Sequence, residues 1–397
     1  MSNSSLKIYI LICVISWLSA YSSSKNQETL RLATFNVSIE ATNYLSRNDI
    51  AEDPTRSAIV GRLLTNGDHP QIRNIAEIIQ RTRPDVLLLN EFDYIKDPEQ
   101  GIELFIKNYL NVSQNSQPKI DYPYYYIAPV NTGVPSPFDL DNNGTKTGVA
   151  GDAYGFGYYP GQYAMALLSQ HPIKHKEIRT LKSFLWKDMP DALKPYNRDG
   201  SPWYSNEEWN KLRLSSKSHW DIPIELKKGK LHIIAAHPTP PTFDGDEDRN
   251  GKRNHDEIRL INDYISDKPY LKDDKGTVGG LNKDSRFVVM GDLNSSPDEG
   301  DSIKTAIRQL TDHPLVDSSC VPRSSAGQLA RPDNQFASEH TAAWGLRVDY
   351  VLPSRLGLKT TNCGIFWPDK NHPQYTLIET RKASSDHRLV WVDIALD

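Results

Sequence analysis

Apolar and polar positions follow two patterns along the chain, one typical of helices and one of strands. Isoleucines at positions 72, 75, 78 and 79 have the spacing of one helix face and stop before Arg83-Pro84, which predicts a helix over residues 72–82. A similar spacing predicts a helix over residues 255–265. Short apolar runs predict strands at residues 31–37, 85–90, 163–169, 231–236, 287–290, 347–352 and 389–394. The order strand, helix, strand at the start indicates layers of sheet and helix.

Two long stretches interrupt this pattern. Residues 94–160 are rich in Tyr, Pro, Gly and Asn, which predicts a structured loop region. Residues 184–222 form a second loop-rich insertion. Its tryptophans could pack inside the insertion or form a platform for lipids or bases, and packing is the favoured interpretation; they are Trp186, Trp203, Trp209 and Trp220. Since no stretch has the composition of a linker, we expect one α/β domain over residues 27–397 with these two insertions.

The first residues have a different composition from the rest. Lys7 precedes an apolar run over residues 8–18 and then small residues up to Ser22, the pattern of a secretory signal peptide over residues 1–22. An uncleaved anchor is the alternative, although the run is shorter than the roughly 20 residues that cross a bilayer. We therefore expect a secreted protein, extracellular or periplasmic.

The cysteines leave one question open. Cys13 lies in the expected signal peptide, so Cys320 and Cys363 remain. An even pair in an exported protein can form one disulfide, and neither residue has the spacing of a zinc site. The sequence does not give the distance between their Cα atoms, so paired and free forms both stay open.

Polar residues recur where apolar strands end. Carboxylates and imidazoles are costly to bury there unless they are paired or bound to a metal. Strand ends that converge on one sheet edge form a typical active-site cleft. One motif alone could be structural, as Asp and Asn favour turns, but the set together predicts catalysis. The motifs are Thr34-Phe-Asn36, Leu89-Asn-Glu91, Ala236-His-Pro238, Gly291-Asp-Leu-Asn294, Arg347-Val-Asp-Tyr350 and Ser385-Asp-His387.

These motifs, with the strand at residues 163–169, resemble those of the endonuclease/exonuclease/phosphatase superfamily. DNase I, exonuclease III, neutral sphingomyelinases and inositol polyphosphate 5-phosphatases belong to it. The resemblance runs from about Leu30 to Asp397, and its most specific motif is Ser385-Asp-His387. It implies an α/β (α+β) fold like that of DNase I, a four-layer sandwich of two stacked mixed β-sheets flanked by helices.

The resemblance also implies a metal site. Glu91 is the expected ligand of Mg²⁺ or Mn²⁺, ions that prefer hard oxygen ligands. Asn36 would sit beside the ion and orient Glu91 or the phosphate, and Asp386 lies where a second carboxylate is expected. Gln162-Tyr163 stands where members often carry Asn or His, so a substrate contact is expected from Tyr163, with Gln162 as the alternative. Arg253 is a further candidate for a phosphate contact, and a solvated charged segment is the alternative there.

The remaining roles concern the attacking water and the phosphate. Asp292 is expected to position and deprotonate the water, while Asn294 bonds the phosphate or orients Asp292. His237 and His387 are expected to flank the phosphate and to stabilise its charge or protonate the leaving oxygen. Asp349 should hydrogen-bond His387 and raise its pKa. Because phosphoryl transfer to water needs mainly positioning and charge neutralisation, direct in-line attack by water is the expected mechanism.

A separate motif suggests calcium. Residues 246–257 fit the spacing of a twelve-residue calcium loop, with Asp246, Asp248, Asn250 and Glu257 as ligands. A predicted helix follows the motif but none precedes it. A solvated charged loop is therefore the favoured interpretation. A shorter version at residues 139–144 lacks the final Glu.

Three functions fit the sequence: a secreted phosphodiesterase or phosphatase, an extracellular DNase I-like nuclease, and a catalytically silent binding protein. The net charge is −4, or −5 without Lys7, and a nucleic-acid binder usually shows a basic stripe. This favours the first function over the second, although a bound cation can offset acidic charge. The complete motif set argues against the third. We expect a monomer without an obligate protein partner, whose substrate is a phosphate ester of a small molecule, a lipid headgroup or nucleic acid.

Overall fold

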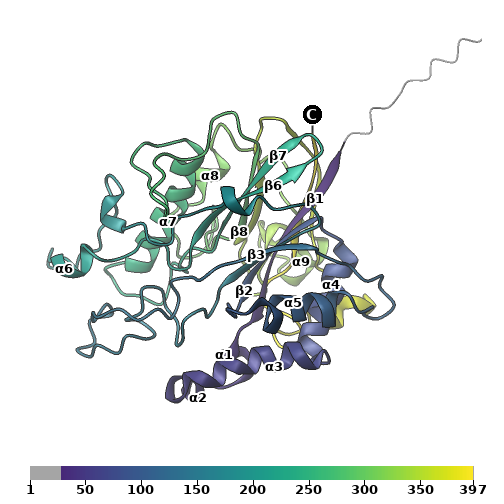
Figure 1. The fold of residues 1–397 in the computed structure, drawn as a ribbon, viewed down its shortest axis with the longest axis horizontal. Helices are drawn as coiled ribbons and strands as arrows, with labels where there is room; N and C mark the ends of the chain where they lie inside the picture. Colours follow the sequence, from purple (N-terminus) through teal and green to yellow (C-terminus); the bar gives the residue numbers. More distant parts are fainter. Residues whose placement is uncertain (1–27, 397) are drawn as a thin grey trace, which may run out of the picture.

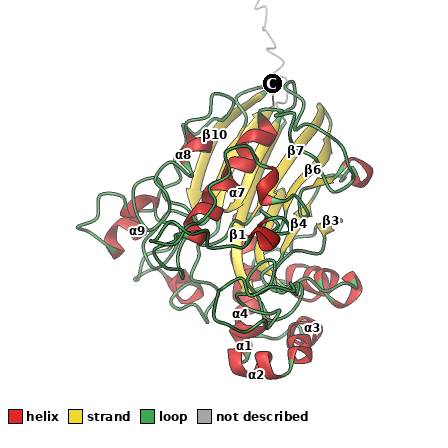
Figure 2. Ribbon diagram, turned by 90° about the vertical axis from the view of Figure 1, so that its left-hand side faces the viewer, coloured by secondary structure: helices red, strands yellow, loops and turns green. Residues whose placement is uncertain are grey.

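The computed structural model describes residues 28–396, so the expected signal peptide lies outside the described residues. Two β-sheets stack face to face, with α7 and α8 on one side and α3, α4 and α5 on the other (Figure 1). Seen after a quarter turn, from the left-hand side of Figure 1, α7 lies in front of the strands (Figure 2). These four layers confirm the predicted DNase I-like sandwich. No helix in the described part is long and apolar enough to cross a membrane.

The first sheet has six strands. β1 and β2 are parallel, with Asn36 opposite Asn90, and every other pair in this sheet is antiparallel. In spatial order the strands are β10 (Leu358–Ile365), β11 (Val390–Leu396), β1 (Thr29–Ile39), β2 (Val86–Phe92), β4 (Met165–Ser169) and β3 (Tyr124–Ile127). The two parallel strands in the centre carry the first two motifs.

The second sheet has five strands, of which only β7 and β8 are parallel. Asp292 at the end of β8 lies opposite Asp349 at the start of β9. In spatial order the strands are β5 (Arg179–Thr180), β6 (His219–Leu226), β7 (Gly229–Ala236), β8 (Phe287–Asp292) and β9 (Asp349–Pro353). Both sheets are therefore mixed, as predicted.

The helices cover the outer faces of the sheets. The predicted isoleucines of α4 are buried in the cluster outside the six-stranded sheet, and α7 packs in the cluster outside the five-stranded sheet. A third apolar cluster lies between the sheets. The α-helices are α1 (Ala41–Tyr44), α2 (Arg47–Glu52), α3 (Ile59–Asn66), α4 (Pro70–Thr82), α5 (Ile102–Phe105), α6 (Asn206–Trp209), α7 (Arg249–Ile265), α8 (Arg308–Thr311) and α9 (Ser325–Ala330). The short 3₁₀ or π segments are η1 (Pro54–Ala58), η2 (Pro98–Gln100), η3 (Ile106–Leu110), η4 (His175–Glu177), η5 (Trp186–Asp188), η6 (Ala337–Glu339) and η7 (Pro373–Leu377).

The insertions contain more regular structure than the sequence predicted. The region 94–160 holds α5, η3 and the edge strand β3, and the region 184–222 includes the first residues of β6. The sequence pattern does not predict β6, because this strand contains Pro223 and Pro is rare inside a sheet. The proline is tolerated because residues 172–174 pair with β6 here through the carbonyl oxygen of Pro223, which accepts from the backbone N–H of Lys174 at 2.9 Å, so no N–H of Pro223 is needed. Trp186 and Trp220 are fully buried. Trp203 and Trp209 pack against the apolar cluster outside the five-stranded sheet, so the packing interpretation is confirmed.

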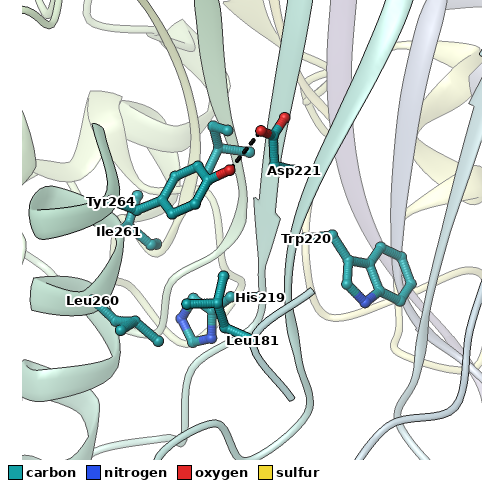
Figure 3. A pocket seen from close by; sticks show the side chains of 8 residues that line it. Leu181, His219, Trp220, Asp221, Leu260, Ile261 and Tyr264 are labelled. Carbon is teal, nitrogen blue, oxygen red and sulfur yellow. Dashed lines mark hydrogen bonds between the residues drawn. The ribbon is translucent and has the colours of Figure 1, made fainter. Parts of the chain in front are cut away.

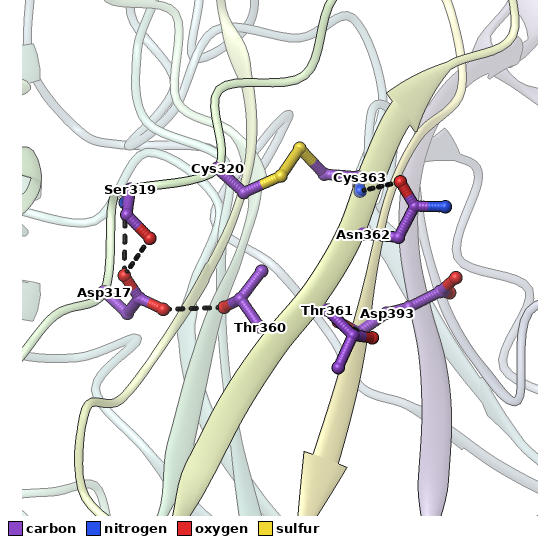
Figure 4. The surroundings of a disulfide bond; sticks show 8 residues. All are labelled: Asp317, Ser319, Cys320, Thr360, Thr361, Asn362, Cys363 and Asp393. Carbon is purple, nitrogen blue, oxygen red and sulfur yellow. Dashed lines mark hydrogen bonds between the residues drawn. A yellow bond between two sulfur atoms is a disulfide. The ribbon is translucent and has the colours of Figure 1, made fainter.

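A disulfide joins Cys320, in the segment before α9, to Cys363 on β10, with a Cα–Cα distance of 6.2 Å (Figure 4). It closes a loop with a sequence separation of 43 residues. Loop closure of this length restricts the unfolded chain and stabilises the fold by about 4 kcal/mol at most. We expect dithiothreitol to lower the melting temperature of the wild type. A Cys320→Ser/Cys363→Ser variant should melt lower and ignore the reductant; equal melting of wild type and variant would contradict this prediction.

Candidate active site

The strand ends of both sheets meet at one place. Asn36 Nδ2 on β1 donates to Asp292 Oδ2 on β8 at 3.0 Å, and the Asp292 backbone N–H donates to Asn90 Oδ1 on β2 at 3.2 Å. Asn90 Oδ1 also accepts from Thr34 Oγ1. The side chain and the backbone of Asp292 thus join the two sheets directly, where the first, second and fourth motifs meet.

Asp292 lies at the centre of the site. Its Oδ1 accepts from the backbone N–H of Asn294 at 3.1 Å. Nε2 of His237 lies 3.4 Å from Oδ2, and Nε2 of His387 lies 3.6 Å from it. Burial raises the pKa of Asp292 to about 7, although the charge of His387 opposes this shift. A carboxylate in this condition can accept a proton near neutral pH.

The two histidines differ in charge. Nδ1 of His387 donates to Asp349 Oδ2 at 3.0 Å. Burial lowers the pKa of His387, but the carboxylates of Asp349 and Asp292 overcome that effect and raise it to about 10. The pKa of His237 lies well below its usual value because it is buried and because Lys217 and His387 are positive. The site therefore presents one cationic and one neutral imidazole.

Strained backbone marks the rim of the site. Ser38, Glu91, Tyr163 and Asn294 have φ values of 47°, 54°, 55° and 52°, in the left-handed region that side chains other than Gly rarely adopt. Such strain costs of order 1–3 kcal/mol per residue and persists where the surroundings enforce it, which is often at functional sites. All four residues belong to the predicted motifs or stand two residues from one.

Close packing explains the glycine of the fourth motif. A Cβ on Gly291 would lie 1.9 Å from the carbonyl oxygen of Ala236 on the neighbouring strand β7. Only glycine allows β7 and β8 to approach this closely. This approach sets His237 beside Asp292.

Glu91 fits the predicted metal site. Its carboxylate is half-buried and, within the described residues, accepts a single long hydrogen bond, from Ser38 Oγ at 3.4 Å. Among residues 28–396 no cationic side chain lies within 4.0 Å of it. Asn36 Oδ1 accepts only a long bond from the backbone of Ser38 at 3.3 Å. Two weakly bonded oxygens at one sheet edge are suitable ligands for a hard cation.

A second group could in principle hold a cation. Asp292, Asp349 and His387 offer ligand atoms within 4.8 Å of one another. A protonated imidazole, however, has no lone pair for a metal, and the raised pKa of His387 keeps it protonated. Its positive charge already balances one carboxylate of this group.

Two predicted ligands have partners within the protein. Asp386 pairs with Arg381 Nη1 at 3.3 Å, and it forms no group of metal-ligating side chains with Glu91 in the described chain. Arg253 was predicted to contact phosphate, but its buried guanidinium donates to the backbone oxygens of Leu214, Tyr154 and Arg213. The structure thus gives Arg253 to the fold and contradicts its phosphate contact, while a metal role for Asp386 stays a prediction. The hydroxyl of Tyr163 lies 3.5 Å from Thr42 Oγ1, and its contact with substrate stays a prediction.

Arg253 can be tested as a structural residue. Replacing it by Met leaves three carbonyl oxygens without their donor, each of which costs about 1–3 kcal/mol when buried. We expect Arg253→Met to unfold at clearly lower urea concentration while KM for a phosphate ester stays unchanged. A raised KM at unchanged stability would contradict this structural role and support a phosphate contact by Arg253.

The predicted calcium loop is absent because the helix begins earlier than expected. α7 starts at Arg249, so Asn250 and Glu257 are helical residues. Glu257 is fully buried and accepts from the backbone N–H groups of Ser216 and Thr239. The polar sequence before position 255 concealed this first part of the helix. In the shorter motif, Asp139 and Asp141 do lie near Asp152, with ligand atoms within 4.8 Å.

A small cavity between α7 and β6 is separate from the site. Leu181, His219, Leu260 and Ile261 are among its lining residues, and Tyr264 donates to Asp221 at 2.6 Å beside it (Figure 3). Its volume of about 10 Å³ has room for one water molecule at most. It does not accommodate a substrate.

The sequence comparison identifies the family. A model of the Endonuclease/Exonuclease/phosphatase family matches residues 33–387, a span that holds every motif of the site. The chain therefore belongs to this family, whose members are hydrolases acting on phosphate esters. No curated protein matches the chain.

Solved structures of similar shape come from several organisms. An endonuclease/exonuclease/phosphatase from Beutenbergia cavernae DSM 12333 is 16% identical, with 93% of this chain and 72% of that chain covered and a TM-score of 0.48. A mutant beta toxin from Staphylococcus aureus with bound magnesium ions is 13% identical, with 92% and 99% covered and a TM-score of 0.44. The human Nocturnin catalytic domain with bound sulfate is 15% identical, with 93% and 95% covered and a TM-score of 0.42.

Proposed function

We propose that this protein is a secreted, divalent-metal-dependent phosphoester hydrolase in which water attacks the phosphorus directly. The observation that carries this proposal is the carboxylate of Asp292, held by Asn36 at 3.0 Å and flanked by two histidines. Its pKa of about 7 suits a group that takes a proton from water at neutral pH. The backbone bond from Asn294 fixes the carboxylate in place, so Asn294 acts by orienting the base.

His387 and His237 have different roles in the proposed reaction. The cationic His387 stabilises negative charge on the phosphate or donates a proton to the leaving oxygen. Asp349 keeps this imidazole charged and fixes its orientation. The neutral His237 can donate a hydrogen bond from Nε2 without adding charge. Imidazoles held in different protonation states beside one base are typical of acid–base catalysis.

Glu91 and Asn36 would hold the metal ion. When bound, Mg²⁺ or Mn²⁺ would neutralise charge on the phosphate oxygens. The weakly bonded oxygens of both side chains support this assignment. Calcium has no part in the proposal, because the predicted ligands at residues 246–257 lie partly within α7.

The substrate we propose is a small or lipid-derived phosphate ester, acted on by a monomer. The net charge of −4 supports this over the nuclease alternative. Secretion is supported by the apolar run near the start of the sequence and by the disulfide, which is typical of oxidising compartments.

A substrate panel tests the proposal. The purified protein is incubated with 4-nitrophenyl phosphate, bis(4-nitrophenyl) phosphate, phosphatidyl and sphingosyl phosphodiesters, plasmid DNA and RNA, each with Mg²⁺, with Mn²⁺ and with chelator. Chelator-sensitive release from the small or lipid esters alone supports the proposal. Preferential cleavage of plasmid or RNA would identify a nuclease instead. No turnover on any substrate would favour the silent binding protein.

A further inference from the structure

Lys217 is a buried lysine at the edge of the site. It stands two residues before β6, at the end of the β6–β7 hairpin where His237 follows β7. Its side chain and backbone together are only 5% exposed. Burial lowers the pKa of Lys217, and the carboxylates of Glu257, Asp292 and Glu91 oppose that shift. The positive charge of Lys217 in turn contributes to the lowered pKa of His237. Nζ of Lys217 reaches the carbonyl oxygen of Pro238, the residue after His237, so the ammonium group lies beside the groups assigned to catalysis.

The ammonium group has little to bind in the folded chain. In the described part of the chain, its one hydrogen bond is to the carbonyl oxygen of Pro238, at a long 3.5 Å. That oxygen already accepts from Asn294 Nδ2 at 3.2 Å. Within residues 28–396 no carboxylate lies within 4.0 Å of Lys217 Nζ. A buried cation without a close partner is strongly unfavourable, so packing alone does not account for this lysine.

Surrounding contacts hold Lys217 in this position. The carboxylate of Glu257 on α7 accepts from the backbone N–H of Ser216 at 2.6 Å and from that of Thr239 at 2.7 Å. The backbone oxygen of Lys217 accepts from Asn131 at 2.9 Å. Glu257 thus joins the segment before β6 to the segment after β7. The lysine is fixed beside the reacting groups before any substrate arrives.

We propose that Lys217 is a substrate-binding residue whose ammonium group donates to a non-bridging oxygen of the bound phosphate ester. The phosphoryl anion is the partner that the folded chain does not supply, and a charge-assisted bond of this kind is short and strong. The inference rests on the proposed function, because it places the phosphate at Asp292. It adds a cation from the protein on the His237 side, apart from the metal at Glu91.

Binding of inorganic phosphate tests this inference without turnover. Isothermal titration of phosphate into the chelator-treated protein compares the wild type with Lys217→Met, Lys217→Gln and Lys227→Met, an exposed lysine of the β6–β7 turn. We expect both Lys217 variants to bind phosphate about ten- to a hundredfold more weakly. Lys227→Met should bind like the wild type. Since a buried unpaired charge is removed, Lys217→Met should melt at the same temperature as the wild type or higher.

A purely structural role predicts a different pattern. Gln can still donate to the Pro238 carbonyl, so a structural lysine would make Lys217→Gln bind phosphate like the wild type. Wild-type phosphate affinity in either Lys217 variant would overturn the inference. Weak binding by both variants with no hydrolysis of any ester would leave Lys217 as an anion ligand and reject the proposed function. Hydrolysis with unchanged phosphate affinity and KM in both variants would reject Lys217 and keep the function.

Discussion

Replacing Asp292 by Asn is expected to lower kcat by about a thousandfold, within the range for loss of a general base. Asn keeps the shape of the side chain and can still accept from Asn294. It cannot take a proton from water. Steady-state hydrolysis of bis(4-nitrophenyl) phosphate with saturating Mg²⁺ measures the change.

The stability of this variant separates catalysis from structure. The folded pKa of Asp292, about 7, lies above the usual value of a carboxyl group, so its ionisation in the fold is unfavourable. The stability of the wild type therefore falls as the pH rises from about 4 through 7. Asp292→Asn removes this loss and should melt at the same temperature or higher at pH 8. An inactive variant that also melts much lower would mean that Asp292 holds the fold.

Replacing Asp349 by Asn is expected to lower kcat about a hundredfold or more and to change the pH profile. Activity needs Asp292 ionised and His387 protonated, so the wild-type rate should rise through pH 7 and fall near pH 10. Without the carboxylate of Asp349, His387 loses its proton at lower pH. The alkaline limb of the profile should therefore move to lower pH. The acid limb should also move to lower pH, because the charge of Asp349 helps to raise the pKa of Asp292.

The His387–Asp349 pair should also make the stability of the protein depend on pH. The pKa of His387 is raised in the fold, so the protonated His387–Asp349 pair stabilises the folded protein. This contribution is fully present below pH 6.5 and is lost as the pH rises toward 10. Urea unfolding of the wild type should show that loss, and Asp349→Asn should lack it. An alkaline limb at the same pH in both proteins would show that Asp349 does not control His387.

Much of this architecture could be predicted from short patterns. A buried strand ending in a polar group has few structural uses, so Asn36, Asp292 and His387 were recognisable without coordinates. The isoleucine spacing of α4 was equally direct. Edge strands were missed because half of their residues face water: β10 alternates with Lys and Thr and carries no apolar run. β6 was missed because of Pro223.

Other parts of the site depend on contacts that no local pattern records. Lys217 lies in a loop-rich stretch. Its segment is held near the proposed site by Glu257, which accepts hydrogen bonds from the backbone of Ser216 and Thr239. The reverse error has the same origin. Arg253 looked like a phosphate ligand in a charged run, yet backbone oxygens far away in the sequence bind it. Long-range partners decide whether a charged side chain serves the fold or the substrate.

The most direct test is the rate of bis(4-nitrophenyl) phosphate hydrolysis as the free Mg²⁺ concentration is raised from zero. The wild type and Glu91→Gln are compared, since Gln keeps the size of the side chain and removes its charge. We expect no turnover in chelator, saturation by Mg²⁺ in the wild type, and a requirement for at least about tenfold more Mg²⁺ in the variant. Turnover that persists in chelator, or identical Mg²⁺ curves for the two proteins, would contradict a metal-dependent site built on Glu91.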